Sequence, residues 1–523
     1  MKKTSVPPIG GCVAVAHCVA LCLALLFAGG VAADEIVPTP RAIALPATAT
    51  NRPYLAAAMA QEPVNLATRG YVEEEFLLSG NANVYDWVAA AGTAGSAVQV
   101  RRPHLPYTTR VLLRRPLDAK RFSGRVIVEM LDDAGQGESA PLWGLSQEHF
   151  LRQGDAWIGL TLRPDALATL RRFDPLRYAK VGFAPRAAGD CTAAAAAAAA
   201  APATAGAAQA EAGLAWDVVA QLGALLRSSS KENPLAAFTL KRVIAAGYSQ
   251  SGTDLVTYIN ALHAPLRLGG GGPVFDGYLV AAPAVAAAPL NACAVALPAD
   301  DPRRRIGVRD VPVVAVLTQT DVDRVPALRR PDGDVPANYR GYEIAGAAHA
   351  GPYPAGLSTA TDLAIAGLAA APAPAEICNE APGNFPAGLA FNAIWMQFDD
   401  LLARGMPMQN ATPLQTDAAG RPALDAQGNA LGGLRLPQIA VPVAAYTGHS
   451  TPKRAAPDNQ RVCGVTGSMR RLDSAELKAL YGSRAEYLRR YNAAVDQAVA
   501  DRWLVPADAA AVKSLAARTP LSF

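Results

Sequence analysis

The segment GYSQSG at residues 247–252 restricts the possible folds of this chain more than any other feature. It follows KRVIAA at 241–246, which is typical of a buried strand, and it precedes a helical pattern at 253–262. A serine at so sharp a strand-to-helix turn is held at the tip with its hydroxyl exposed. Large side chains two positions before and after the serine would collide with each other, and the residues at these positions, Gly247 and Ser251, are small. The pattern predicts a nucleophile elbow with Ser249 at its tip.

Strand-like and helix-like runs alternate on both sides of this segment. Near-continuous apolar strands that alternate with helices indicate a mostly parallel sheet covered on both faces. The predicted strands are 110–114, 125–131, 156–161, 241–246, 276–281, 311–317 and 339–344, and the predicted helices are 213–227, 253–262 and 391–403. An elbow inside such a sheet predicts an α/β-hydrolase fold, with insertions and a C-terminal extension.

A serine hydroxyl is a weak nucleophile and needs a base within hydrogen-bond reach. In an α/β-hydrolase the base is a histidine that follows the serine and the acid in the chain. His349 comes directly after the last predicted strand, among small residues that suit a loop at the carboxyl edge of the sheet. The sequence therefore predicts His349 as the base. The other histidines outside the N-terminal leader are His104, His149, His263 and His449.

The acid is expected between the serine and the histidine, at the end of a strand. Asp321 occupies that place after the strand at 311–317, and we predict that it orients the imidazole. Asp323 is the rival, and either aspartate could instead cap the loop. Ser251 is the competing nucleophile, although its neighbours suit the elbow less well.

An acyl-transfer site also needs backbone N–H donors directed at the oxyanion. Gln250, directly after the nucleophile, is one predicted donor. The second is expected after the strand at 125–131, from the backbone of Leu131 or Asp132. Gly135 and Gly137 give that loop freedom to approach a substrate.

The chain resembles the bacterial proteins described as alpha/beta hydrolase domain-containing proteins. The resemblance runs from about Tyr71 to Ala510. The matching segments are 125–131, Trp216-Asp217 with Gln221, GYSQSG, EIAGAAHA at 343–350, 428–448 and Leu480-Tyr481. It implies a hydrolase fold with Ser249 and His349 in these roles, and it supplies no substrate. Asp132-Asp133 departs from the Asn-containing segment that the resemblance leads us to expect.

The N-terminus has the layout of a secretory signal peptide. Two lysines precede an apolar run at about 12–27, and small residues end at Ala33 before Asp34. We predict a signal peptide at 1–33 with cleavage near Ala33, and the alternative is an uncleaved anchor. The product would be exported to the periplasm or beyond.

The remaining chain is predicted to form one main domain. An extended N-terminal arm occupies 34–70, and an α/β-hydrolase domain occupies 71–523. That domain is expected to have an insertion near 164–212 and a cover or tail region at about 351–523. After the helix at 391–403, the tail is expected to be largely irregular.

The cysteine content permits disulfides in the exported protein. Four cysteines remain after the leader, an even number that permits two disulfides with three possible pairings. They are Cys191, Cys293, Cys378 and Cys463.

Without C-x-x-C or H-E-x-x-H motifs, no metal and no cofactor are predicted. The net charge is only +4, and scattered basic pairs without aromatic neighbours do not indicate nucleic-acid binding. No stable membrane insertion of the mature chain is expected.

The leading hypothesis is an exported hydrolase of carboxylic esters, in which Ser249, His349 and Asp321 act through an acyl-enzyme. The alternatives are an amidase or peptidase with the same three residues, and a non-catalytic binding protein of the same fold. The expected partner is a small-molecule ester, and its acyl and alcohol groups and the oligomeric state stay open. Arg435 either pins the C-terminal region through an ion pair or binds a substrate carboxylate.

Overall fold

The computed structural model describes residues 35–48, 51–88, 97–133, 137–187, 191, 210–307, 309–330 and 335–523. At its centre lies a ten-stranded sheet in the order β12-β11-β10-β8-β5-β6-β4-β3-β2, with β7 also paired to β4. The predicted signal peptide at 1–33, with its cleavage site near Ala33, lies outside the described residues.

The six strands from β6 to β12 in this order are parallel. They are β5 (Arg125–Met130), β6 (Ala156–Leu160), β8 (Arg242–Tyr248), β10 (Gly277–Ala281), β11 (Val313–Thr318) and β12 (Tyr339–Ile344). Every residue of β5, β6, β10 and β11 is buried, because helices cover both faces of this half of the sheet. The predicted strands are confirmed here, with small differences at their ends.

The other half of the sheet is antiparallel and was largely missed. β3 (Tyr71–Trp87) and β4 (Val98–Pro116) form a hairpin of 17 and 19 residues, where the sequence predicted only a short strand at 110–114. That prediction was wrong in length because much of the first part of β4 is exposed and its polar residues hide the strand pattern. β2 (Arg41–Ala44) and β7 (Gly182–Phe183) complete this half.

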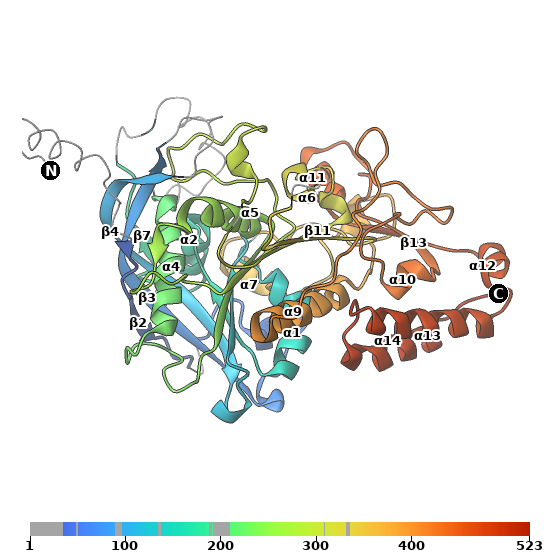
Figure 1. The fold of residues 1–523 in the computed structure, drawn as a ribbon, viewed down its shortest axis with the longest axis horizontal. Coiled ribbons are helices and arrows are strands. Elements are labelled where there is room, and N and C mark those ends of the chain that lie inside the picture. Colours follow the sequence, from blue (N-terminus) through green and yellow to red (C-terminus); the bar gives the residue numbers. More distant parts are fainter. Residues whose placement is uncertain are drawn as a thin grey trace, which may run out of the picture.

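Helices flank the sheet, and Figure 1 shows α1 and α9 on one side of β11 and α5 on the other. Their bounds are α1 (Pro141–Gln153), α2 (Pro164–Phe173), α4 (Ala215–Arg227), α5 (Ser249–Thr257) and α9 (Ala387–Arg404). α4 is buried from Ala215 to Leu226. α5 begins at Ser249, earlier than predicted, and continues as a π-helical turn at Tyr258–Leu262. Among the described residues, no helix has an apolar stretch long enough to span a bilayer.

The C-terminal region is helical, which corrects the expectation of a largely irregular tail. α12 (Ser474–Tyr481), α13 (Arg484–Ala500) and α14 (Pro506–Arg518) lie beyond the end of the sheet (Figure 1). They bury a small core of their own, which includes Leu477, Tyr487, Tyr491, Val495 and Val512. These helices are stabilised by tertiary contacts that their weak sequence pattern did not reveal.

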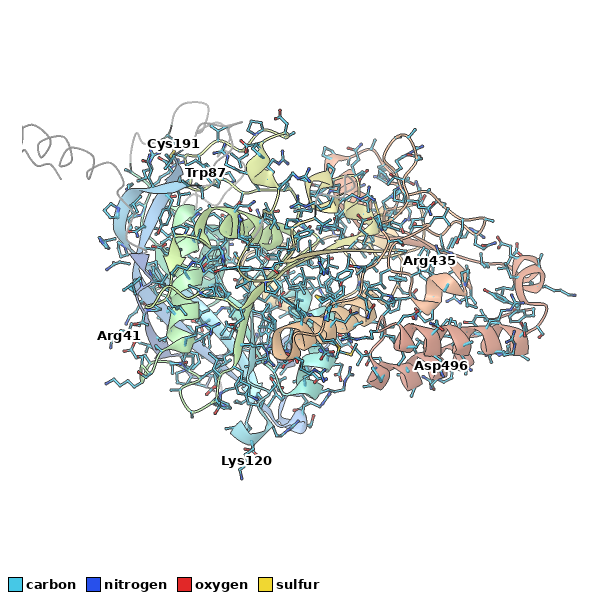
Figure 2. The ribbon with its side chains drawn as sticks, viewed as in Figure 1. Arg41, Trp87, Lys120, Cys191, Arg435 and Asp496 are labelled. Atoms are coloured by element: carbon cyan, nitrogen blue, oxygen red, sulfur yellow. A yellow bond between two sulfur atoms is a disulfide. The ribbon has the colours of Figure 1, made fainter. Side chains whose placement is uncertain are left out.

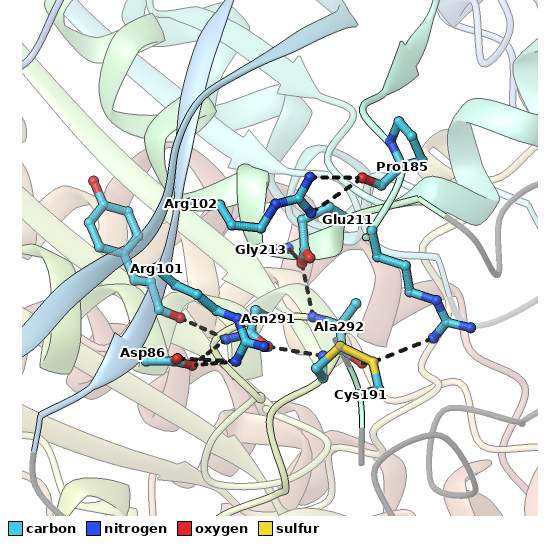
Figure 3. Close-up of a disulfide and its surroundings, with 12 residues drawn as sticks. Asp86, Arg101, Arg102, Pro185, Cys191, Glu211, Gly213, Asn291 and Ala292 are labelled. Carbon is cyan, nitrogen blue, oxygen red and sulfur yellow. Dashed lines mark hydrogen bonds and ion pairs between the residues drawn. A yellow bond between two sulfur atoms is a disulfide. The ribbon is translucent and has the colours of Figure 1, made fainter. Parts of the chain in front are cut away.

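The structure selects one of the three possible disulfide pairings. Cys191 is bonded to Cys293, in the loop after β10, and Cys378 is bonded to Cys463. The second bond joins the end of α8 (Pro374–Ile377) to α11 (Pro457–Val465). Figure 3 shows the first disulfide near the ion pair between Arg101 and Asp86.

Candidate active site

The turn between β8 and α5 has the tight geometry expected of an elbow. Ser249 has φ +55°, a left-handed conformation that costs a non-glycine residue roughly 1–3 kcal/mol. A Cβ at Gly247 would lie 2.4 Å from the carbonyl oxygen of Ser251, and one at Gly252 would lie 2.7 Å from that of Ala281. No larger residue fits at either position, so the backbone can turn this tightly only because both residues are glycine.

Ser249, His349 and Asp321 form one hydrogen-bonded chain. The Oγ of Ser249 lies 2.9 Å from Nε2 of His349, and Nδ1 of His349 lies 2.7 Å from Oδ1 of Asp321. The three residues follow β8, β12 and β11, whose carboxyl ends meet at one edge of the parallel sheet. The structure thus brings together the three residues that the sequence singled out.

Asp321 is fully buried and is held from two sides. Its Oδ2 accepts hydrogen bonds from the backbone N–H of Thr318 at 3.0 Å and from the hydroxyl of Thr318 at 2.6 Å. Burial alone would raise the pKa of Asp321, but His349 and the bonds from Thr318 together hold it below its usual value. Asp323, the rival acid, is exposed, and it is Asp321 that hydrogen-bonds His349.

The loop that carries His349 is fixed by residues that the sequence analysis did not identify. The hydroxyl of Thr320 accepts the backbone N–H of His349 at 3.0 Å and donates to the carbonyl of Gly448. The hydroxyl of Tyr248 donates to the carbonyl oxygen of His349 at 2.6 Å. The position of Tyr248 directly before Ser249 could have drawn attention to it in the sequence. The contact with Gly448 links distant parts of the chain and left no such signal.

Ser251 is not available as a nucleophile. Its side chain is 1% exposed, and its Oγ accepts the N–H of Tyr248 at 3.0 Å while donating to the carbonyl of the same residue at 2.9 Å. The hydroxyl closes the first turn of α5. This structural role explains why a serine fits where a glycine is usual.

Two of the other histidines are engaged or enclosed elsewhere. His149 is buried in α1, and burial lowers its pKa to about 3. His263 lies 2.8 Å from the hydroxyl of Tyr278 and also contacts Asp310. Within the described ranges, no group of three or more His, Cys, Asp or Glu residues is placed to hold a metal ion.

The backbone donors predicted at Leu131 and Asp132 require a correction. The N–H of Leu131 donates to the carbonyl of Leu160, which extends the pairing of β5 with β6, and the N–H of Asp132 donates to the carbonyl of Ser139. Both distances are 3.0 Å, so neither N–H is free for an oxyanion. The Gln250 N–H is directed at the carboxyl group of Asp132, with 3.0 Å between Gln250 N and Oδ1.

Arg435 is bound within its own segment. Its Nη2 lies 3.1 Å from Oδ2 of Asp425 and 3.1 Å from the carbonyl of Ile439, and the side chain lies next to α10 (Pro437–Ala440) in Figure 2. Leu434, directly before it, pairs with the end of β12. The ion pair of Arg435 therefore stabilises its own segment, and it is Leu434 that joins this segment to the sheet.

The family that the sequence matches agrees with this architecture. The family model for the alpha/beta hydrolase domain matches residues 37–514, which confirms the predicted fold class. No curated protein matches the chain. Similar solved structures include the methylesterase BT1017, with 13% identity over 52% of this chain and 50% of that chain and a TM-score of 0.26. An alpha-beta serine hydrolase homologue from Coxiella burnetii has 11% identity over 46% and 84%, with a TM-score of 0.25.

Proposed function

This chain belongs to the alpha/beta hydrolase domain family, and from that premise we propose that it is an exported serine hydrolase of carboxylic esters. The observation that carries the proposal is the hydrogen-bonded chain from Ser249 through His349 to Asp321. A nucleophile, a base and an orienting acid in that order are the parts that acyl transfer needs.

The proposed reaction has two stages. Ser249 Oγ attacks the ester carbonyl while Nε2 of His349 accepts its proton, and the carboxylate of Asp321 stabilises the imidazolium that forms. The proton then passes from His349 to the departing alkoxide, so an alcohol leaves and the acyl group stays on Ser249. A water molecule, deprotonated by His349, attacks the acyl-enzyme and releases the carboxylic acid and the free serine.

An ester is a less demanding substrate than an amide for this site. An alcohol leaves from a tetrahedral intermediate more readily than an amine does. The Gln250 N–H, which would stabilise that intermediate, is already engaged by a carboxyl group, and this favours the substrate with the better leaving group. The ester is therefore our first choice, with the amide as the alternative that the same residues could serve.

Matched substrates test the proposal. We expect the purified protein to react with a fluorophosphonate probe at Ser249 and to hydrolyse a p-nitrophenyl ester faster than the p-nitroanilide with the same acyl group. A faster anilide would indicate an amidase. Neither labelling nor turnover of either substrate would indicate a binding protein that keeps the fold.

Export predicts two features of the protein recovered from the periplasm. The N-terminus is expected at Asp34, and non-reducing peptide mapping is expected to link Cys191 with Cys293 and Cys378 with Cys463. Each bond constrains the unfolded chain and adds about 2–4 kcal/mol to the free energy of unfolding. Mass spectrometry reads both features. An intact N-terminus would contradict cleavage, and four free thiols in periplasmic protein would contradict the disulfides alone.

A further inference from the structure

The carboxyl group of Asp132 lies at the backbone donor that an oxyanion would use. Its Oδ1 accepts the N–H of Gln250 at 3.0 Å. The residue is 5% exposed. An acyl-transfer site directs the N–H that follows the nucleophile at the developing negative charge. An ionised Asp132 would therefore compete with the oxyanion for the same donor and repel it.

The two backbone donors that the sequence predicted on this loop, at Leu131 and Asp132, are both engaged. The N–H of Leu131 is used by the sheet, and Asp132 and Ser139 exchange two hydrogen bonds, at 3.0 and 2.8 Å, across the base of the loop. The backbone of Asp132 is thus fixed with its N–H turned away from Gln250. Its side chain remains as the part that faces the donor.

We propose that Asp132 is a catalytic residue that acts in its protonated form and donates its carboxyl O–H to the oxyanion of the tetrahedral intermediate. The inference rests on the acyl transfer proposed for Ser249. One carboxyl oxygen keeps its contact with Gln250, and the protonated oxygen donates to the substrate. The proton stays on Asp132 throughout, so this residue stabilises charge and exchanges no atom with the substrate. A carboxylic acid kept neutral by its surroundings can serve as such a donor.

The surroundings of Asp132 favour the neutral form. The titratable and charged groups that interact with it are His349, Asp133, Arg163, Tyr248 and Tyr353. Burial raises the pKa of Asp132 to about 6, against the opposing effects of His349 and of the N–H groups of Gln250 and Ser251. The acid form is the major one below that pH, and the blocking carboxylate is the major one above it. The contribution of Asp132 to turnover should therefore fall as the pH rises through this range.

The pH dependence of kcat/KM for one simple ester tests the inference, measured from about pH 5 to about pH 9. We expect the wild-type profile to have a falling limb that reports the ionisation of Asp132, in addition to the rising limb that any general base gives. Asp132→Asn should abolish the decline and stay within about tenfold of the wild-type maximum, because its amide can donate at every pH. Asp132→Ala should also lose the decline and run slower than Asp132→Asn. The difference should be smaller than the roughly 10²- to 10³-fold cost of a missing donor, because the substitution frees the Gln250 N–H for the oxyanion. Asp133→Asn is the matched control and should keep the decline.

Two results would overturn the inference. If Asp132→Asn shows the wild-type decline, Asp132 does not titrate in the reaction. If Asp132→Ala is as fast as Asp132→Asn, the side chain is not a donor. Should Asp132→Ala fail to fold, the profile of Asp132→Asn still decides the matter. Turnover that survives Ser249→Ala would count instead against the proposed function, so the two failures are distinguishable.

Discussion

Ser249→Ala is expected to lower kcat by about 10⁴- to 10⁶-fold and to abolish fluorophosphonate labelling, with the fold unchanged. The hydroxyl is the only part of the side chain that the substitution removes, and its one described hydrogen bond is to His349 at 2.9 Å. Alanine has the same difficulty as serine at φ +55°, so the backbone of the turn is under the same constraint in both proteins. Steady-state kinetics and probe labelling measure the loss, and circular dichroism checks the fold.

Ser251→Ala provides the matched control for this experiment. It also removes one hydroxyl from the same turn, but that hydroxyl closes the first turn of α5 through Tyr248 and is 1% exposed. We expect a loss of stability of about 1 kcal/mol, with labelling and turnover retained. An inactive Ser251→Ala together with an active Ser249→Ala would show that the nucleophile was assigned to the wrong serine.

The positions of Ser249, His349 and Asp321 could be predicted because each follows a strand of the parallel half of the sheet. β8 and β11 are almost wholly apolar, so their ends are visible in the sequence, whereas β12 also contains Arg340 and Glu343. Parallel strands bring their carboxyl ends to one edge, and three sites far apart in the chain therefore meet without further information.

The orientation of Asp132 could not be predicted in the same way. The sequence placed the residue correctly after β5, and the error lay in expecting its backbone to face the site. Whether a backbone N–H is free depends on what the loop pairs with, and here Ser139 takes the N–H of Asp132. Pairing across a loop is decided by its three-dimensional course, which leaves no periodic signal in the sequence.

The support of the His349 loop shows the same limitation over a longer range. Thr320 joins the backbone of His349 to Gly448, and the N–H of Ala350 donates to the carbonyl of Val465 at 2.9 Å. The C-terminal region therefore supports the His349 loop from outside the parallel sheet. Its helices begin at clear caps, with Asp473 and Ser483 each accepting the N–H of a glutamate three residues on. Those caps were a local signal that the Pro-rich sequence before them obscured.

Asp321→Asn is expected to lower kcat by about 10⁴-fold while leaving the protein folded. The carboxylate accepts from Nδ1 of His349 at 2.7 Å, which directs Nε2 toward Ser249 as the proton acceptor. It also stabilises the imidazolium, and its lowered pKa shows that this buried position favours the charged form. The asparagine is neutral, and since Thr318 donates two hydrogen bonds to Oδ2, the amide NH₂ is expected to turn toward His349 and favour the wrong tautomer.

Asp323→Asn separates this effect from a general loss of negative charge in the loop. Asp323 is exposed and lies two residues away, so the variant changes the net charge equally and should stay within a few-fold of the wild-type kcat. The rate of fluorophosphonate labelling should follow the same order, since it depends on activation of Ser249 and not on binding of an ester. The reverse ranking, with Asp323→Asn inactive and Asp321→Asn active, would make Asp323 the acid and would require the loop after β11 to rearrange before reaction.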